Sequence, residues 1–208
     1  MRGGAALVKV ELGVNLPIRT LPLGGNEPSD AELVSRARLG DAWAERALYR
    51  RHAPKLLRVA RRILGNDADA LDVLQDAFLI VFRRLGQLLD GAAFGPWLMK
   101  SGVRLAAKKL KWRRFTGRVF FTSADPAELF DPKPDTPAEV TDQLRRLEGV
   151  LTRLPADQRV AWILRYVEGY ELTEVAAACG VSLATSKRWI AAAQSKVQAK
   201  LTEGEAAR

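Results

Sequence analysis

Apolar residues recur every three or four positions along most of the chain, which is the spacing of one buried face of an α-helix. Helices are predicted at 29–40, 41–64, 69–85, 96–114, 139–153, 156–168, 172–179 and 183–201. No strand pattern of weight appears in either half of this region. The pattern therefore predicts an all-α fold.

Local start and stop signals support these boundaries. Ser29 and Glu32 form a capping-box pattern at the first helix, and Gly40 is suited to end it. Pro54 lies inside the second predicted helix and is expected to kink it. Pro96 suits the first turn of the fourth helix.

The helices fall into two groups, which predicts two small helical domains joined by a flexible tether. The first domain spans 29–115 and the second 138–203, with a short tail at 204–208. The segment 116–137 is rich in proline and acidic residues, which is typical of an extended linker. Residues 1–28 are interpreted as a poorly ordered arm, although the alternation at 7–12 would also suit an edge strand on a partner.

The helix predicted at 69–85 has two different faces. One is an apolar stripe expected to be buried, made of Leu71, Leu74, Phe78, Val81 and Leu85. The other carries Asp72, Gln75 and Asp76, flanked by the apolar Val73, Leu79 and Phe82 that a single stripe cannot all bury. This second face favours docking to a basic protein partner, and the alternative is an ordinary solvated face.

Charge points to a polyanionic ligand. The 208-residue chain has a formal net charge of +9, and basic residues cluster beside aromatic ones. Its single cysteine excludes an intramolecular disulfide framework and a cysteine-rich zinc site. Lys9 and Glu11 interrupt any secretory signal, and no apolar stretch is long enough to insert in a membrane. A cytoplasmic protein is expected.

The segment 91–124 contains no acidic residue but many lysines and arginines. Lys100, Arg104 and Lys108 share one helical face, and Trp97 and Trp112 lie in the same run. Cations that follow a phosphate backbone, together with aromatic rings for stacking, form a surface for single-stranded nucleic acid. The alternative places Trp97 in the core and leaves the charges as a solvated face.

The C-terminal segment 172–197 has the layout of a DNA-binding helix-turn-helix. Small residues at 176–178 permit close helix approach, Gly180 makes the turn, Val181 fills the core and Ser182 caps the second helix. Its inward positions are Ile190, Ala193 and Val197, and its DNA-facing positions are Thr185, Lys187, Arg188 and Trp189. The alternative is a helical hairpin with a solvated basic face.

Four segments resemble successive regions of extracytoplasmic-function (ECF) RNA polymerase sigma factors of the sigma-70 family. They read SDAELVSRARLGDAWAERALYRRH, DADALDVLQDAFLIVFRRL, FGPWLMKS and LPADQRVAWILRYVEGYELTEVAAACGVS. The resemblance covers about 29–115 and 138–203, most of the chain. It implies a domain like sigma region 2 and a helix-turn-helix domain like sigma region 4.

The resemblance also implies partners and roles. The first domain would dock on the beta-prime clamp of core RNA polymerase through Asp72, Gln75, Asp76 and Phe82, and the beta flap would be a second polymerase contact. The minus-ten strand would be melted and held by Asp90, Phe94, Trp97, Lys100, Arg104, Lys108, Lys111, Trp112 and Arg113, with 90–94 receiving a flipped base. The minus-thirty-five duplex would be read by Ser182, Thr185, Lys187, Arg188 and Trp189. An anti-sigma factor is a further expected partner.

Some positions depart from the family pattern. The minus-ten helix usually shows Asn-Leu-Ala followed by Asp, whereas here Arg104 precedes Leu-Ala and Lys108 follows. In the recognition helix Ser186 stands where a buried valine is common, and Trp189 replaces a frequent arginine. These departures leave the minus-ten base preference open and predict weak duplex binding by the second domain without polymerase.

No catalytic constellation is evident, so the chain is predicted not to be an enzyme and to need no cofactor, metal or small-molecule substrate. His52 has no partner ligands at metal spacing, and Cys179 is interpreted as a packing residue. Two alternatives to a sigma factor remain: a stand-alone helix-turn-helix regulator of duplex operators, and a sigma-like adaptor that has lost promoter melting. A sigma factor needs both the docking face and the single-strand surface, and a repressor needs neither.

Overall fold

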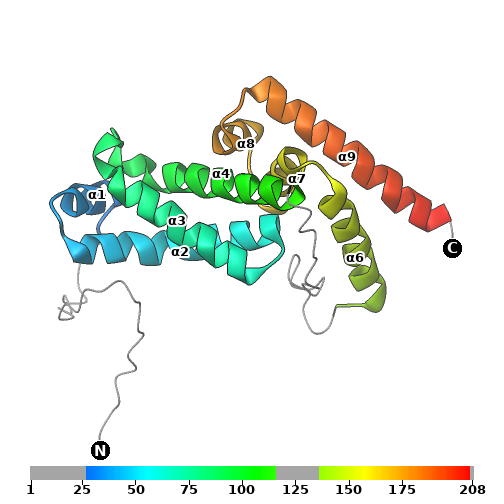
Figure 1. Ribbon diagram of the computed structural model, residues 1–208, viewed down its shortest axis with the longest axis horizontal. Coiled ribbons are helices and arrows are strands. Elements are labelled where there is room, and N and C mark those ends of the chain that lie inside the picture. The colour runs from blue at the N-terminus through cyan, green and yellow to red at the C-terminus, as the bar shows by residue number, and fades with distance from the viewer. Residues whose placement is uncertain (1–26, 116–135, 207–208) are drawn as a thin grey trace, which may run out of the picture.

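A computed structural model describes residues 27–115 and 136–206, and within them it is helical without strands (Figure 1). The predicted all-α fold is confirmed. The helices are α1 (Asp30–Arg38), α2 (Ala42–Leu64), α3 (Asp67–Arg83), α4 (Phe94–Phe115), α6 (Ala138–Arg153), α7 (Ala156–Trp162), α8 (Leu172–Cys179) and α9 (Leu183–Ala206). Most of the predicted arm at 1–28 and of the linker at 116–137 lies outside the described residues.

The predicted caps are present at the start of the first domain. The Ser29 hydroxyl accepts a hydrogen bond from the Glu32 N–H at 3.3 Å, and the Glu32 carboxylate accepts one from the Ser29 N–H at 2.7 Å. Asp41 caps α2 in a similar way by accepting from the Trp43 N–H at 2.9 Å. The helix α2 continues as one element through Pro54.

The buried face of α3 differs from the predicted stripe. Leu71 was expected in the core, but 49% of its surface is exposed, whereas Val73, expected on the outer face, is 2% exposed. Leu71 and Val73 lie at opposite edges of the same apolar stripe, and the packing of α3 against α2 and α4 buries the edge that carries Val73. The buried set is Ala70, Val73, Leu74, Ala77, Phe78 and Val81.

The helix α4 packs against α2 and α3 and closes the first domain, running nearly along α2 in Figure 1. Gly102 permits close approach, because a Cβ at this position would overlap the Leu56 side chain of α2. Short 3₁₀ turns at Leu85–Gln87 and Gly91–Ala93 connect α3 to α4. The side chains of Phe94, Leu98, Val103 and Ala106 are buried along its inner face.

The second domain is built from α6 to α9. A single π-helical turn, η3 (Ile163–Val167), continues α7, so the predicted helix 156–168 is present but not α-helical throughout. Gly180 follows α8 with φ +69°, a left-handed conformation that glycine adopts without strain, and it makes the turn into α9. Ile190, Ala193 and Val197 face inward from α9, as predicted.

The two domains touch each other. Helices α7 and α8 lie against α4, with α8 above α4 in Figure 1 and α6 and α9 extending away from the first domain. Buried apolar residues of both domains belong to one continuous cluster. The second domain therefore lies over part of the outer face of α4.

Candidate nucleic-acid interface

The outer face of α4 carries the basic residues predicted to hold a single strand. Arg104, Lys108 and Lys111 are exposed and Lys100 is half-buried, so these four side chains lie along the solvent side of the helix. Trp112, near its end, is 52% exposed. The spacing of one turn between cations matches a surface that follows a phosphate backbone.

Two other basic residues of α4 hold the bundle together instead. The Lys109 ammonium lies 2.8 Å from the Asp69 carboxylate and 2.7 Å from the Asp72 carboxylate, both on α3. The Arg113 guanidinium pairs with Asp69 and donates to the Leu64 carbonyl oxygen at 3.2 Å. Burial lowers the pKa of Arg113 from its usual value. Arg113, a predicted DNA contact, is therefore engaged at the α2–α3–α4 junction.

The aromatic residues at the start of α4 are less available than the sequence suggested. Phe94 is completely buried, with its ring 6.2 Å from that of Phe82 and 5.3 Å from that of His52. In this conformation it offers no face to a flipped base, because its neighbours cover it. Trp97 is half-buried and packs on the core, which favours the alternative interpretation of this residue.

The loop before α4 is preorganised by its own hydrogen bond. Asp90 is exposed, and its carboxylate accepts from the Ala92 N–H at 2.9 Å, which caps the short turn Gly91–Ala93. Gly91 packs so closely on α1 that a Cβ would lie 2.8 Å from the Ala31 Cα. The loop is thus fixed to α1 at one edge of the basic surface.

The recognition helix α9 begins as predicted. The Ser182 hydroxyl accepts from the Thr185 N–H at 3.2 Å. Ser186, which stands where an apolar side chain was anticipated, is completely buried, and its hydroxyl donates to the Leu183 carbonyl at 2.9 Å, so the polar group is satisfied. Lys187 and Arg188 are exposed and project from the first two turns.

Two helix-turn-helix predictions need correction. Val181 was expected to fill the core but is only half-buried, whereas Val175, Ala176 and Ala178 of α8 are buried. Trp189 was expected to face DNA, but it is half-buried beside α4 and lines the space between the two domains.

The outer face of α3 combines acidic and apolar groups. Asp72, Gln75 and Asp76 are exposed, and Leu71 lies on the same side of the helix. Phe82 is half-buried against Phe78, with ring centroids 5.6 Å apart, so it contributes less to this face than predicted. Leu71 is the member that sequence reasoning missed, because its spacing also fitted the buried stripe.

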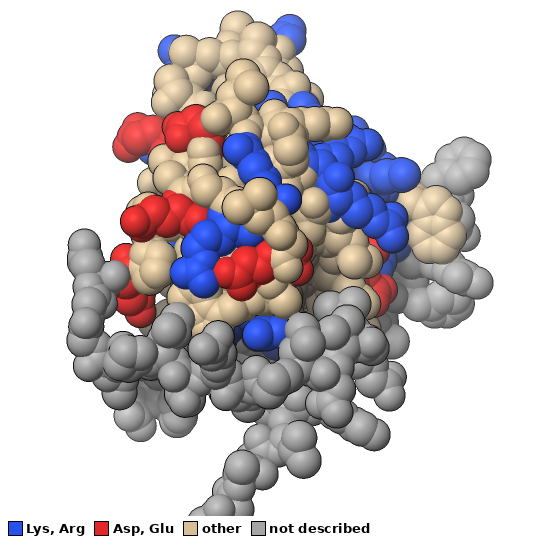
Figure 2. All heavy atoms as spheres, turned by 90° about the vertical axis from the view of Figure 1, so that its left-hand side faces the viewer, with Lys and Arg blue, Asp and Glu red and all other residues tan. Residues whose placement is uncertain are grey.

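Acidic and basic side chains are distributed unevenly over the surface. On the face in Figure 2, the largest group of Lys and Arg side chains lies on the right, and most Asp and Glu side chains lie on the left. Such separation suits a protein that binds a polyanion and a protein partner on different sides.

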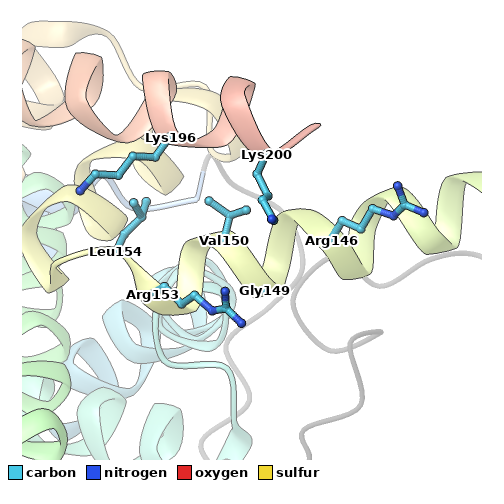
Figure 3. Close-up of a pocket in the computed structure, with 7 residues that line it drawn as sticks. All are labelled: Arg146, Gly149, Val150, Arg153, Leu154, Lys196 and Lys200. Carbon is cyan, nitrogen blue, oxygen red and sulfur yellow. The ribbon is translucent and has the colours of Figure 1, made fainter. Parts of the chain in front are cut away.

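A groove lies between α6 and α9 (Figure 3). Its volume is about 580 Å³, and it is lined by Arg146, Gly149, Val150, Arg153, Leu154, Lys196 and Lys200. Apolar Val150 and Leu154 lie between basic side chains from both helices, as the close-up shows. Sequence reasoning did not identify this groove, although apolar residues recur along α6 with few of them buried.

A second cavity, of about 320 Å³, separates α4 from the second domain. It is lined by Val103, Arg104, Ala107, Lys108, Lys111, Asp157, Val160, Cys179 and Trp189. Predicted minus-ten and minus-thirty-five residues thus face each other across it. Among the described residues, no helix is long and apolar enough to cross a membrane, and no cluster suits a metal ion.

Comparison with known proteins identifies the family of the chain. Residues 48–116 match Sigma-70 region 2, and residues 144–196 match Sigma-70, region 4. The chain is 33% identical over 174 residues to the ECF RNA polymerase sigma factor SigM of Mycobacterium tuberculosis, covering 84% of this chain and 85% of SigM. The chain belongs to the ECF sigma factors of the sigma-70 family.

Other similar proteins agree with this family assignment. The chain is 33% identical over 150 residues to the RNA polymerase sigma factor CarQ of Myxococcus xanthus, covering 72% of this chain and 84% of CarQ. Its fold resembles that of CnrH in complex with the cytosolic domain of CnrY, with a TM-score of 0.58, 24% identity and coverage of 84% and 97%. It also resembles RpoE of Bartonella quintana in complex with the anti-sigma factor NepR, with a TM-score of 0.52, 21% identity and coverage of 74% and 94%.

These matches assign the candidate surfaces to regions. The acidic and apolar face of α3 and the basic face of α4 lie within the segment that matches region 2, and α8 and most of α9 lie within the region 4 match. The prediction of a sigma factor is confirmed over that of a stand-alone regulator. Sigma factors as a family are not catalysts.

Proposed function

We propose that this sigma factor binds core RNA polymerase through the outer face of α3 and directs promoter-specific initiation in the cytoplasm, without catalytic activity of its own. The observation that carries the proposal is an exposed face with acidic and apolar groups on the same domain as an exposed basic helix. Leu71 supplies apolar area, and Asp76 supplies a carboxylate that forms no ion pair with the described residues. Such a face suits the basic surface of the beta-prime clamp.

The minus-ten strand is assigned to the outer face of α4. Lys100, Arg104, Lys108 and Lys111 provide cations for phosphates, and Trp112 provides an exposed ring for stacking. Stacking on an aromatic side chain contributes about 1–3 kcal/mol per base, which offsets the few kcal/mol needed to unstack and flip a base. We assign Asp90 to the loop that receives this base. Phe94, which is buried, and Arg113, which is paired with Asp69, support this surface from inside the domain.

The minus-thirty-five duplex is assigned to the first turns of α9. Ser182, Thr185, Lys187 and Arg188 lie at the N-terminal end of a recognition helix, the part that enters the major groove in helix-turn-helix proteins. Lys187 and Arg188 are exposed there. Trp189 joins this set only after the second domain leaves α4.

Two further partners are proposed for the second domain. The apolar groove between α6 and α9, with its four basic residues, suits an amphipathic acidic segment, and we assign it to the beta flap of polymerase. Because CnrH and RpoE were solved with CnrY and the anti-sigma factor NepR, an anti-sigma factor is a proposed partner as well. The linker at 116–137 then joins the two promoter-reading domains.

Binding to core polymerase tests the proposal. Asp76→Arg is expected to weaken binding of the purified chain by at least about tenfold, because it places a like charge against a basic partner. Asp72 is a poorer choice, since its carboxylate pairs with Lys109 inside the domain. Glu139→Arg, an exposed position at the start of α6, is the matched control and is expected to bind as the wild type does.

The outcome separates the candidate functions. Equal binding by Asp76→Arg and the control, with both folded, would refute docking through α3. Run-off transcription by the wild-type complex then distinguishes a sigma factor, which opens promoter DNA, from an adaptor that cannot melt DNA.

A further inference from the structure

The second domain covers part of the surface that the proposed function assigns to the minus-ten strand. The Arg104 guanidinium packs against Gly180, so closely that a Cβ on this glycine would overlap it. The Lys111 ammonium lies 2.8 Å from the Asp157 carboxylate of α7. The Lys111 side chain stays 58% exposed, but its charge is shared with Asp157, which weakens its attraction for a phosphate in this arrangement.

The first domain in turn covers part of the recognition helix. Trp189 of the recognition helix lines the same 320 Å³ cavity as Arg104 and Lys108. Val160 on α7 and Val103 on α4, each 1% exposed, line its apolar part. The two predicted DNA surfaces therefore block one another where they meet.

A separate contact fastens the domains together at α2. Glu168, just after the π-helical turn, pairs with Arg62 and lies 3.5 Å from the Arg58 guanidinium. Both arginines belong to the first domain, and the Glu168 side chain is only 2% exposed because it is covered at this contact between the domains. Beside it, the Lys55 ammonium lies 5.3 Å from the centre of the Tyr170 ring, within range of a cation–π interaction.

The chemistry of these contacts resembles that of nucleic-acid binding. Glu168 and Asp157 are carboxylates that meet a strongly basic domain, and they satisfy arginine and lysine as phosphates would. The Glu168 carboxylate is buried, whereas the Arg62 and Arg58 side chains are 26% and 55% exposed, so a cation in place of Glu168 would be buried beside like charges. Glu168 therefore acts as the fastening point of the interface.

The closed arrangement is incompatible with simultaneous reading of both promoter elements. Elements centred near minus ten and minus thirty-five lie about 25 base pairs apart, or about 85 Å along B-DNA. In the structure Arg104, on the minus-ten face, touches Gly180 at the entrance to the recognition helix. The domains must therefore separate before the two elements can be bound together.

We propose that the free chain is held in a self-inhibited closed state, in which the second domain covers the α4 surface and Glu168 latches it to Arg58 and Arg62. Opening the latch exposes α4 and Trp189 together. The inference rests on the proposed function only for the identity of the DNA that the exposed surfaces bind. The closure itself is a property of the protein alone.

The chain carries a native reporter of this closure. Cys179 is its single cysteine and lines the interdomain cavity. Burial, with a smaller contribution from the Asp157 charge, raises the pKa of the thiol to about 12. Since the thiolate is the reactive form, separation of the domains exposes the thiol and brings its pKa back toward the ordinary value, and both effects accelerate alkylation.

The first experiment measures the rate of Cys179 alkylation by iodoacetamide in the full-length chain. Glu168→Lys is expected to raise this rate at least about tenfold, because it leaves three positive charges together at the latch. Glu139→Lys makes the same charge change on α6, away from the latch, and is expected to match the wild type. Circular dichroism establishes that each variant is folded.

A charge-swapped variant separates the latch from simple damage to the second domain. Arg58→Glu/Arg62→Glu/Glu168→Arg restores attraction across the interface and is expected to return the alkylation rate to within about threefold of wild type. If Glu168→Lys reacts no faster than Glu139→Lys, the closed state is refuted. If the swapped variant stays as reactive as Glu168→Lys, the latch assignment is refuted.

The second experiment measures affinity for a mixed-sequence, 20-nucleotide single-stranded DNA at fixed salt. Glu168→Lys is expected to bind at least about tenfold more tightly than Glu139→Lys, which controls for the added positive charge. Faster alkylation with no gain over this control would show that the domains open without uncovering a DNA surface, which would overturn the inhibition. Neither alkylation nor this comparison involves polymerase, so failure of docking through α3 is detected separately.

Discussion

Two glycines within helices illustrate how much a single methyl group matters at different positions. Gly102 of α4 is buried, and a Cβ there would overlap Leu56 of α2, which is 1% exposed. Gly149 of α6 is exposed, and no atom lies within 4 Å of the place where its Cβ would be. The same substitution is therefore expected to have opposite effects on stability.

Gly102→Ala is expected to lower the free energy of unfolding by about 1–2 kcal/mol, because overpacking outweighs the gain in helix propensity. Gly149→Ala is expected to raise it by about 0.5–1 kcal/mol, since only the propensity changes. Urea unfolding of both variants checks this pair. A Gly102→Ala protein as stable as Gly149→Ala would show that α2 and α4 are not packed as closely as described.

At the scale of a helix, the sequence predicts the boundaries of the element and its helical nature better than it predicts which face is buried. Ser29, Asp41 and Gly180 mark element boundaries, because capping and left-handed turns are local properties. The buried face of α3 was displaced, since Leu71 and Val73 both fit an apolar stripe and only packing against α2 and α4 decides between them. Phe94 shows the same limit, because the sequence predicts a DNA contact for its ring, whereas packing places the ring in the core.

The sequence also does not show which of the basic residues of α4 face solvent and which are paired within the domain, and two neighbouring lysines provide a direct test. Lys108 is exposed on the outer face, whereas its neighbour Lys109 points to Asp69 and Asp72 of α3. Lys108→Gln is expected to reduce the slope of log affinity for single-stranded DNA against log salt by about 0.7, the loss of one phosphate contact.

Lys109→Gln is the matched control for this measurement. It is expected to leave the salt slope unchanged and to lower stability instead, because Asp69 and Asp72 lose their shared cation. Binding titrations at four salt concentrations, together with urea unfolding, separate the two residues. Equal changes in slope for both lysines would mean that the outer face of α4 is not the surface that meets phosphates.

At the scale of the whole molecule, the sequence predicts two domains but not their contact. The latch joins Glu168 to Arg62, which is 106 residues away, and no periodic pattern reports a pairing of that kind. Its members also look ordinary in the sequence, since charged residues occur throughout both domains. The consequence is that the sequence predicts two DNA-binding surfaces but does not predict that each covers part of the other.

The closed state leaves one functional surface open, and this sets an order of events. Leu71, Gln75 and Asp76 on α3 are exposed while α4 is covered, so the clamp can dock before the domains separate. A ligand that binds two states equally well does not shift their equilibrium. A fragment containing only the clamp helices is therefore expected to bind the chain without changing the rate of Cys179 alkylation.

Complete core polymerase should act differently, because it contacts the α3 face and the α6–α9 groove at the same time, and the distance between these two surfaces differs between the closed and open states. We expect core polymerase to accelerate Cys179 alkylation in the wild-type chain and to have little further effect on Glu168→Lys, which is already open. Acceleration by the clamp fragment alone would instead show that docking on α3 itself releases the latch. No acceleration by complete polymerase would mean that opening waits for promoter DNA, and adding a promoter fragment to the same complex would then have to raise the rate.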